Sequence, residues 1–180
     1  MTSNTIQLDH ELATVIEVVE RRTISFMQDQ LGMKPIAIER RLLHKESVVL
    51  RAMTAIVGVG SKAGLYIAYS YEQSLIRAMM KRYTVGLTVS AEEEDLYVRE
   101  TASDVVNVIV GNCTADLAKR KEVITLSPPM LVEGARTIQG RSETTIAAST
   151  FRFPEGELDI AFVGPQIMFD ERLNYKGGRP

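Results

Sequence analysis

The stretch VRETASDVVNVIVGNCTADL, residues 98 to 117, decides the fold because its apolar residues recur at the spacing of an α-helix. At about 100° per residue, these positions fall on one broad arc: Val98, Ala102, Val105, Val106, Ile109, Val110, Cys113 and Leu117. An arc this wide must face a hydrophobic core. The sequence therefore predicts a long helix packed along one side.

The opposite side of this helix carries a stripe of different character. Glu100, Asp104, Asn107, Gly111 and Ala115 follow one another at steps of four, three, four and four. An ordinary solvent face explains such a stripe, but Asn is a mediocre helix former and a mid-helix Gly costs about 1 kcal/mol relative to Ala. Low side chains just past an acid and an amide would let another protein come close. From the residues alone, a solvent face and a binding stripe both stay open.

The helix is predicted to span residues 91 to about 119, with charges that suit both of its ends. Ser90 and the acidic residues 92–95 stand at its start, where the helix dipole favours negative charge, and Lys119 to Lys121 stand at its end. Helix-start electrostatics explains the acidic group. A patch that binds a partner is the alternative.

The flanking sequence predicts further helices and strands that do not alternate strictly. Asp9 can cap a helix to about Leu31, and Ser70 with Gln73 forms a capping box for a helix to about Tyr83. Extended segments are predicted at residues 36–43, 48–57, 65–69, 123–126, 130–138, 144–153 and 157–163, with a turn at 154–156. This order predicts an α+β fold, with a largely antiparallel sheet packed with long helices, and residues 1–180 are expected to form a single domain.

Glycines at positions 58, 60 and 64 give the segment 58–64 some likeness to a dinucleotide-binding loop. That fingerprint requires a helix to follow, so that the phosphate meets its N-terminus. Residues 65–69 read as a strand instead, and a glycine-rich hairpin is the better interpretation.

Composition excludes several classes of function. Charged residues make up 24% of the chain with a net charge of −2, and no basic run marks a nucleic-acid-binding surface. The single cysteine, Cys113, rules out an internal disulfide, and His10 and His44 stand far apart without the close ligand spacing of a zinc site. The polar N-terminus lacks the features of a secretory signal, and no apolar run is long enough to span a membrane. A cytoplasmic location is therefore expected, with no metal site.

Residues 100–112 resemble the signature helix of the CheX/CheC/FliY chemotaxis phosphatases. The family pattern is an Asp or Ser, three residues, a Glu, two residues, an Asn, and then a Gly-Asn pair; here Asp104 and Asn107 fill the Glu and Asn positions, and Gly111-Asn112 is the pair. Residues 126–134, with Pro128-Pro129, look like a strand entry of CheX, and the 58–64 hairpin followed by a Met-rich helix also fits. The resemblance covers most of the chain and is closest to CheX.

The resemblance implies a protein that removes the phosphoryl group from the aspartyl phosphate of a CheY-like response regulator. Asn107 would position the attacking water and Asp104 would pair with the receiver's lysine, while Glu100, Ser103 and Gly111 would contact the partner. No cofactor of its own is implied, since the receiver holds the Mg²⁺. The likeness also implies a homodimer. One active helix is expected, as in CheX, because the earlier helix has Glu72 but Leu75 where an Asn is required.

The sequence departs from the family pattern at two positions. Asp104 replaces the usual Glu, so its carboxylate reaches one methylene less far, and Glu100 stands where relatives carry Asp or Ser. These changes keep a second hypothesis open, a non-catalytic module of the same fold that binds a receiver domain or a flagellar component. A small-molecule sensor domain is a third, which would need an internal apolar pocket.

Overall fold

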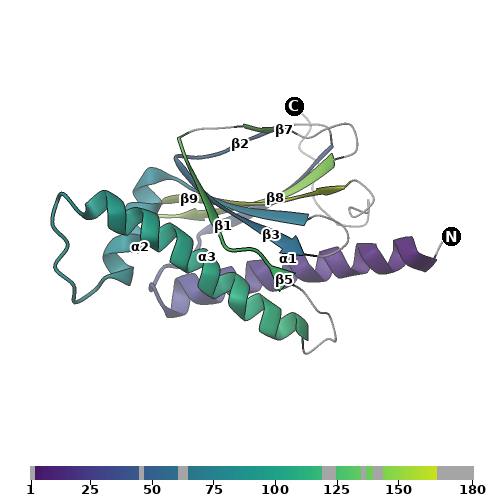
Figure 1. Cartoon of the computed structure of the whole chain (residues 1–180), viewed down its shortest axis with the longest axis horizontal. Coiled ribbons are helices and arrows are strands. Elements are labelled where there is room, and N and C mark those ends of the chain that lie inside the picture. The colour runs from purple at the N-terminus through teal and green to yellow at the C-terminus, as the bar shows by residue number, and fades with distance from the viewer. Residues whose placement is uncertain are drawn as a thin grey trace.

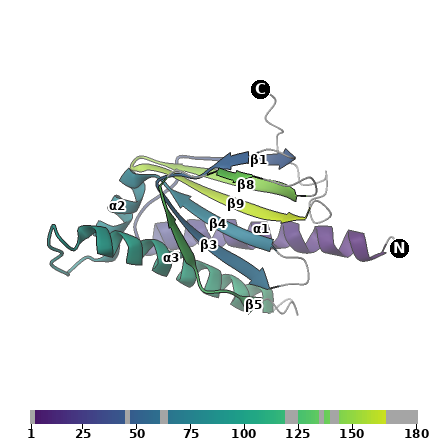
Figure 2. The same cartoon turned by 45° about the horizontal axis from the view of Figure 1, so that its top comes forward.

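The helices lie along one face of a large sheet (Figures 1 and 2). The computed structural model describes residues 3–44, 47–60, 65–118, 125–134, 137–139 and 144–165. Within these ranges the helices are α1 (Ser3–Asp29), α2 (Gln73–Tyr83) and α3 (Glu94–Ala118). The fold is α+β, as predicted.

The large sheet is antiparallel throughout its described pairings. Its strands lie in the order β1-β8-β9-β4-β3-β5, and β6 also pairs with β3 (Figure 2). Their bounds are β1 (Ala37–His44), β3 (Met53–Gly60), β4 (Leu65–Tyr71), β5 (Thr125–Leu126), β6 (Met130–Glu133), β8 (Thr144–Phe153) and β9 (Gly156–Pro165). The glycine-rich segment 58–64 joins β3 to β4 as a hairpin, as predicted, although residues 61–64 lie outside the described ranges.

Two of the predicted strands are wrong, because each is divided between the large sheet and a second, two-stranded sheet. Residues 48–57 form β2 (Ser47–Val49) and β3, and residues 130–138 divide between β6 and β7 (Thr137–Gln139), which pairs with β2. The chain crosses between the sheets at Leu50–Ala52 and again after Gly134, whose N–H donates to the Ala52 carbonyl at 2.8 Å. Val48 and Ile138 then pack on Ala68 of the large sheet, on the face away from the helices.

The predicted capping box at Ser70 is also wrong. Ser70 lies in β4, is 1% exposed, and its hydroxyl bonds to the Thr54 hydroxyl at 2.9 Å and accepts the Arg51 N–H at 2.6 Å. The Ser70 side chain, which the local pattern assigned to a helix start, thus makes hydrogen bonds within the sheet region instead. The N-cap of α2 is Glu72, whose side chain makes no capping bond.

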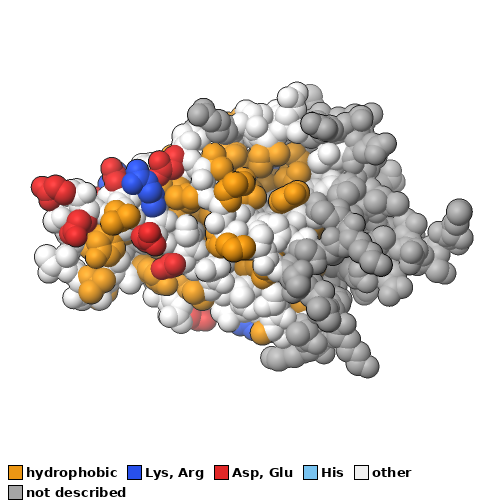
Figure 3. Space-filling model, in the orientation of Figure 1, with side chains coloured by type: hydrophobic (Ala, Val, Ile, Leu, Met, Phe, Trp, Pro, Cys, Tyr) orange, Lys and Arg blue, Asp and Glu red, His pale blue; other side chains and the backbone are white. Residues whose placement is uncertain are grey.

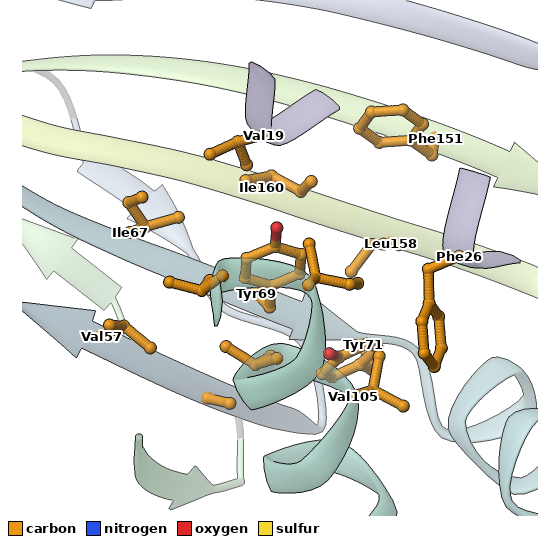
Figure 4. Close-up of a cluster of buried hydrophobic side chains, with 14 of the residues drawn as sticks. Val19, Phe26, Val57, Ile67, Tyr69, Tyr71, Val105, Phe151, Leu158 and Ile160 are labelled. Atoms are coloured by element: carbon orange, nitrogen blue, oxygen red, sulfur yellow. The ribbon is translucent and has the colours of Figure 1, made fainter. Parts of the chain in front are cut away.

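The main core lies between the large sheet and the helices (Figure 4). Tyr69 of β4 is fully buried at its centre, with Val19 of α1 on one side and Val105 of α3 on the other. The Tyr69 hydroxyl bonds to that of Thr23 at 3.0 Å, and Thr23 donates to the Val19 carbonyl at 2.8 Å. A buried hydroxyl without a partner would cost stability, so this pair lets tyrosine occupy the core.

The first helix begins earlier than predicted, and an ion pair between a buried glutamate and a half-exposed arginine fixes it to the sheet. Asp9 lies inside α1, because no Gly or Pro interrupts the helix between Ser3 and Asp9. Further along, Glu20 is 5% exposed and accepts hydrogen bonds from Arg40 of β1 at 2.6 Å and from the Ser149 hydroxyl of β8 at 2.5 Å. These bonds satisfy a charge that would otherwise be costly to bury.

The hairpin between β8 and β9 confirms the predicted turn at residues 154–156. Gly156 has φ of +140°, a conformation that side chains strongly disfavour, and it pairs with Phe153. A Cβ at Gly156 would also lie 2.6 Å from the Ser74 hydroxyl of α2. This turn therefore requires glycine.

Candidate functional site

Helix α3 has the orientation that its sequence predicted. Every residue of the apolar arc is buried, none more than 3% exposed: Val98, Ala102, Val105, Val106, Ile109, Val110, Cys113 and Leu117. The stripe on the other side is exposed: Glu100, Asp104, Asn107, Gly111 and Ala115. Ser103 is half-buried beside it. The packing of α3 on the core thus determines which of its residues are exposed to a binding partner.

The start of α3 lies three residues later than predicted. Residues 91–93 form a turn, in which the Glu93 carboxylate accepts the Ser90 hydroxyl at 2.8 Å, and the helix begins at Glu94. Arg77 of α2 donates to Glu94 at 2.6 Å and to Asp95 at 3.0 Å, and the Glu94 bond raises the pKa of Arg77. Much of the acidic group therefore holds the helix start in place. Lys119 to Lys121 lie outside the described residues.

Three further ion pairs, at two places, hold α3 against its neighbours. Near the start, Arg99 donates to Glu133 of β6. Near the end, Asp116 accepts hydrogen bonds from Arg22 of α1 at 2.5 and 2.7 Å and from Arg21 at 3.0 Å. Together with the buried arc, these contacts provide a rigid support for whatever the exposed stripe binds.

Asp104 and Asn107 are exposed and have no internal partner within the part of the chain that the structure describes. No hydrogen bond or ion pair there involves either side chain. The contrast with Asp116 on the same helix is direct, because that carboxylate is used to tie α3 to α1. The donor and acceptor atoms of Asp104 and Asn107 are available to another molecule.

Gly111 is not required by this fold. A Cβ built at Gly111 meets no atom within 4 Å, so alanine would fit without any shift. The Gly111 carbonyl accepts the Thr114 hydroxyl at 2.6 Å, which an alanine would leave intact. Since glycine in a helix interior is unfavourable, the internal packing offers no reason for it.

We call the exposed residues Glu100, Asp104, Asn107 and Gly111 the α3 ridge. Its chemistry is a carboxylate and a carboxamide one turn apart, with a low surface beyond them. An amide can donate and accept hydrogen bonds at once, and a carboxylate pairs with cations. The ridge can therefore engage a cation and a water molecule on a visiting surface.

Other side chains near the ridge are poor candidates for covalent or metal chemistry. Cys113 is 3% exposed, and burial raises its pKa to about 12, so the thiolate is scarce at neutral pH. This confirms its prediction as a core residue. Among the described side chains, no group of three His, Cys, Asp or Glu is placed to hold a metal ion.

None of the described helices has the length and apolar character that crossing a membrane would need.

The earlier helix does not repeat the motif. Leu75 of α2 is fully buried, so an Asn at that position would lie in the core. Glu72 accepts the Glu157 N–H at 3.0 Å and supports the β8–β9 hairpin. Within the described residues, the paired acid and amide occur on α3 and not on α2.

Sequence reasoning missed two exposed apolar residues beside the ridge. Leu96 is 52% exposed and Val108 is 40% exposed, on the side of α3 away from the core. A helical projection places both outside the buried arc, and this signal could have identified them.

With this geometry established, comparison with known proteins is decisive for the family. A family model described as chemotaxis phosphatase CheX matches residues 53–152, more than half of the chain, from β3 through α3 to β8. The chain belongs to the CheX family. No curated protein sequence matches it at a significant level.

Structures of CheX proteins share the fold at low sequence identity. CheX from Desulfovibrio desulfuricans has a TM-score of 0.70 and 16% identity, over 83% of this chain and 98% of that one. CheX from Vibrio vulnificus has a TM-score of 0.67 and 15% identity, over 82% and 97%. A complex of CheX with CheY, BeF3 and Mg²⁺ from Borrelia burgdorferi has a TM-score of 0.62 and 20% identity, over 83% and 96%.

Proposed function

We propose that this CheX-family chain is a cytoplasmic phosphatase that hydrolyses the aspartyl phosphate of a CheY-like chemotaxis response regulator. The observation that carries the proposal is the exposed, internally unpartnered pair Asp104 and Asn107 on the rigidly held helix α3. Membership of a family described as chemotaxis phosphatase CheX supports a phosphatase activity in chemotaxis. The CheX–CheY complex among the similar structures supports CheY as the kind of partner.

The reaction needs little covalent chemistry from this chain. A water molecule attacks phosphorus, the bond between phosphorus and the aspartyl oxygen breaks, and inorganic phosphate and a free aspartate are released. A Mg²⁺ ion bound to the receiver would supply charge stabilisation at the phosphoryl group. Holding the water in line is then the main contribution left to the phosphatase, and such positioning is worth several kcal/mol.

Asn107 is assigned to the water. Its carboxamide oxygen accepts a hydrogen bond from the water while its NH₂ group donates toward the phosphoryl oxygens. Because the amide is neutral, it does not repel the phosphoryl group as a carboxylate would. A carboxylate at this place would bring like charges together, which is costly in a water-excluded site.

Asp104 is assigned to docking. It would pair with the lysine of the receiver's active site, and the ion pair would gain strength as the interface excludes water. Glu100 and Ser103 would contact the receiver on the same side of α3. Gly111 would allow the receiver's backbone to approach, which accounts for a glycine that the fold itself does not need.

A non-catalytic receiver-binding module is the second candidate, and one feature favours it. Asp104 is one methylene shorter than the Glu of the family pattern, so its carboxylate stands closer to the helix. If that reach is insufficient, the receiver would sit too far away for Asn107 to hold the water in line. Binding would then survive without catalysis.

The homodimer implied by the family remains a prediction.

The two candidates differ in phosphate release. CheY-type receivers from the same organism would be phosphorylated with a small phosphodonor, and phosphate release measured with increasing amounts of this protein. The phosphatase predicts saturable acceleration over the receiver's own hydrolysis, and Asp104→Ala is expected to raise KM by about tenfold or more. If the protein binds the receiver but does not accelerate phosphate release at saturation, the non-catalytic receiver-binding module is the function that stands.

A further inference from the structure

Exposed large hydrophobic side chains gather around α3. Within the described residues they are Ile36, Val49, Tyr66, Tyr83, Val85, Leu87, Leu96, Val108 and Met130. More than half of these lie between residues 83 and 108, which cover the end of α2, the connection and the exposed side of α3. Figure 3 shows hydrophobic side chains at this end of the molecule beside acidic side chains and a smaller group of basic ones. Such a concentration marks an interaction surface more often than chance exposure does.

Two of these residues bracket the catalytic part of the α3 ridge. Leu96 lies one turn before Glu100, and Val108 directly follows Asn107. They are twelve residues apart, or about 18 Å along the helix. A protein partner of ordinary size covers roughly 800 Å² per side, a patch on the order of 30 Å across. Any such partner seated on Asp104 and Asn107 therefore covers Leu96 and Val108 as well.

A hollow of about 310 Å³ opens beside Val108. Phe26 of α1 and Tyr83 of α2 line it with rings whose centroids are 6.3 Å apart, and Val108 and Asn112 line it from α3. Arg22, Ser25, Asp29 and Gln30 complete a lining that is part polar and part apolar. Contact with Phe26, Tyr83 and Val108 would suit one apolar side chain of a partner.

The charge of this surface decides between possible occupants. Glu92, Glu93, Glu100 and Asp104 are exposed, whereas the nearby cations are paired: Arg99 of α3 with Glu133, and Arg21 and Arg22 of α1, the latter at the hollow, with Asp116. A second copy of this chain would bring the same acids against each other across a two-fold axis, and like charges in contact cost several kcal/mol. The occupant must instead be a different protein whose surface is both apolar and basic.

We propose that Leu96 and Val108 are the apolar anchors of the receiver domain, and that the hollow between Phe26, Tyr83 and Val108 takes an apolar side chain of that domain. The inference rests on the proposed function and adds its docking surface. The anchors contribute affinity and lie beside the reacting groups without touching them. Losing them weakens the complex and leaves hydrolysis within the complex unchanged.

The test measures affinity and turnover separately. CheY-type receivers from the same organism, loaded with BeF3⁻ and Mg²⁺ as a stable mimic of the phosphorylated state, are titrated against the wild type, Leu96→Ser, Val108→Ser and the double variant. Val49→Ser is the matched control, since Val49 is 65% exposed on β2, on the face of the sheet away from α3. Circular dichroism melts confirm that each variant folds.

We expect each anchor variant to raise Kd about tenfold, and the double variant more, with no change in Val49→Ser and none in the single-turnover rate at saturation. A double variant that binds within twofold of the wild type overturns the inference. A double variant that instead loses self-association, while binding the receiver normally, also overturns it. If the wild type binds the receiver but releases no phosphate, the proposed activity is wrong and the docking surface still stands. If the wild type binds no receiver, both the proposed activity and the docking surface are wrong.

Discussion

Asp104 and Asn107 leave α3 on the same side, three positions apart, while every residue of the opposite arc is buried. Residues at this spacing have Cβ atoms about 5–6 Å apart, so one partner can engage both at once. The arrangement depends on the buried arc from Val98 to Leu117. Burial of this arc fixes the orientation of α3 about its own axis. The exposure of this pair is therefore a consequence of core packing.

Gly111→Ala should separate stability from function. Alanine fits the space and favours the helix, so the free energy of unfolding is expected to rise by about 1 kcal/mol. If glycine is there for a partner's approach, the same change should raise KM for the phosphorylated receiver. Chemical denaturation and steady-state phosphate release check the two halves. A stabilised variant with unaltered kinetics would show that clearance at Gly111 is irrelevant.

Asp104→Glu tests whether the shorter acid limits docking. The longer side chain restores the reach of the family pattern, so KM should fall by about threefold or more while kcat stays within twofold. Asp104→Asn keeps the size and removes the charge, and should raise KM. Glu92→Gln provides a control for the loss of one exposed acid. An equal effect of Glu92→Gln and Asp104→Asn would point to general electrostatic attraction.

Cys113 should be chemically silent in the folded protein. Burial raises its pKa to about 12, so reaction with a thiol reagent at pH 8 is expected to be slow until denaturant exposes the side chain. Cys113→Ala should cost roughly 1 kcal/mol of stability and leave phosphate release at saturation unchanged. A folded Cys113→Ala protein without activity would indicate a covalent role that the geometry does not support.

The pH dependence of stability should include a contribution from Glu157. Burial alone would raise the pKa of Glu157, but hydrogen bonds from Arg152 at 2.9 Å and Arg51 at 2.5 Å outweigh it and hold the pKa below the usual 4.5. This stabilisation is complete above about pH 4.5 and is lost as the pH falls through the folded-state value. Unfolding by urea between pH 7 and pH 3 should therefore show a flatter profile for Glu157→Gln. Parallel profiles would contradict the assignment.

How far the sequence could predict the structure depends on whether a feature is local. The two sides of α3 follow from helical spacing, and the antiparallel class follows from the order of elements, so both were predictable. The local pattern at Ser70 predicts a helix cap wrongly because the partners of its hydroxyl, Thr54 and the Arg51 N–H, are 16 and 19 residues away in sequence. The three-residue strands β2 and β7 are too short to leave a periodic signal.

The site shows the same division. Asp104 and Asn107 could be placed on the exposed side from spacing alone. The absence of atoms around a Cβ at Gly111 depends on neighbours in space, as does the hollow beside Val108 between three helices. The ion pairs that hold α3, such as Asp116 with Arg22, join residues far apart along the chain, and no local pattern could have paired them.

The central claim is that Asn107 holds the attacking water, and single-turnover hydrolysis of a phosphorylated CheY-type receiver at saturating phosphatase tests it most directly. Asn107→Ala should bind the receiver but lose on the order of 100-fold in rate, while Gln28→Ala, which removes an exposed carboxamide from α1, should keep the wild-type rate. Wild-type hydrolysis by a receiver-bound Asn107→Ala protein would contradict the account.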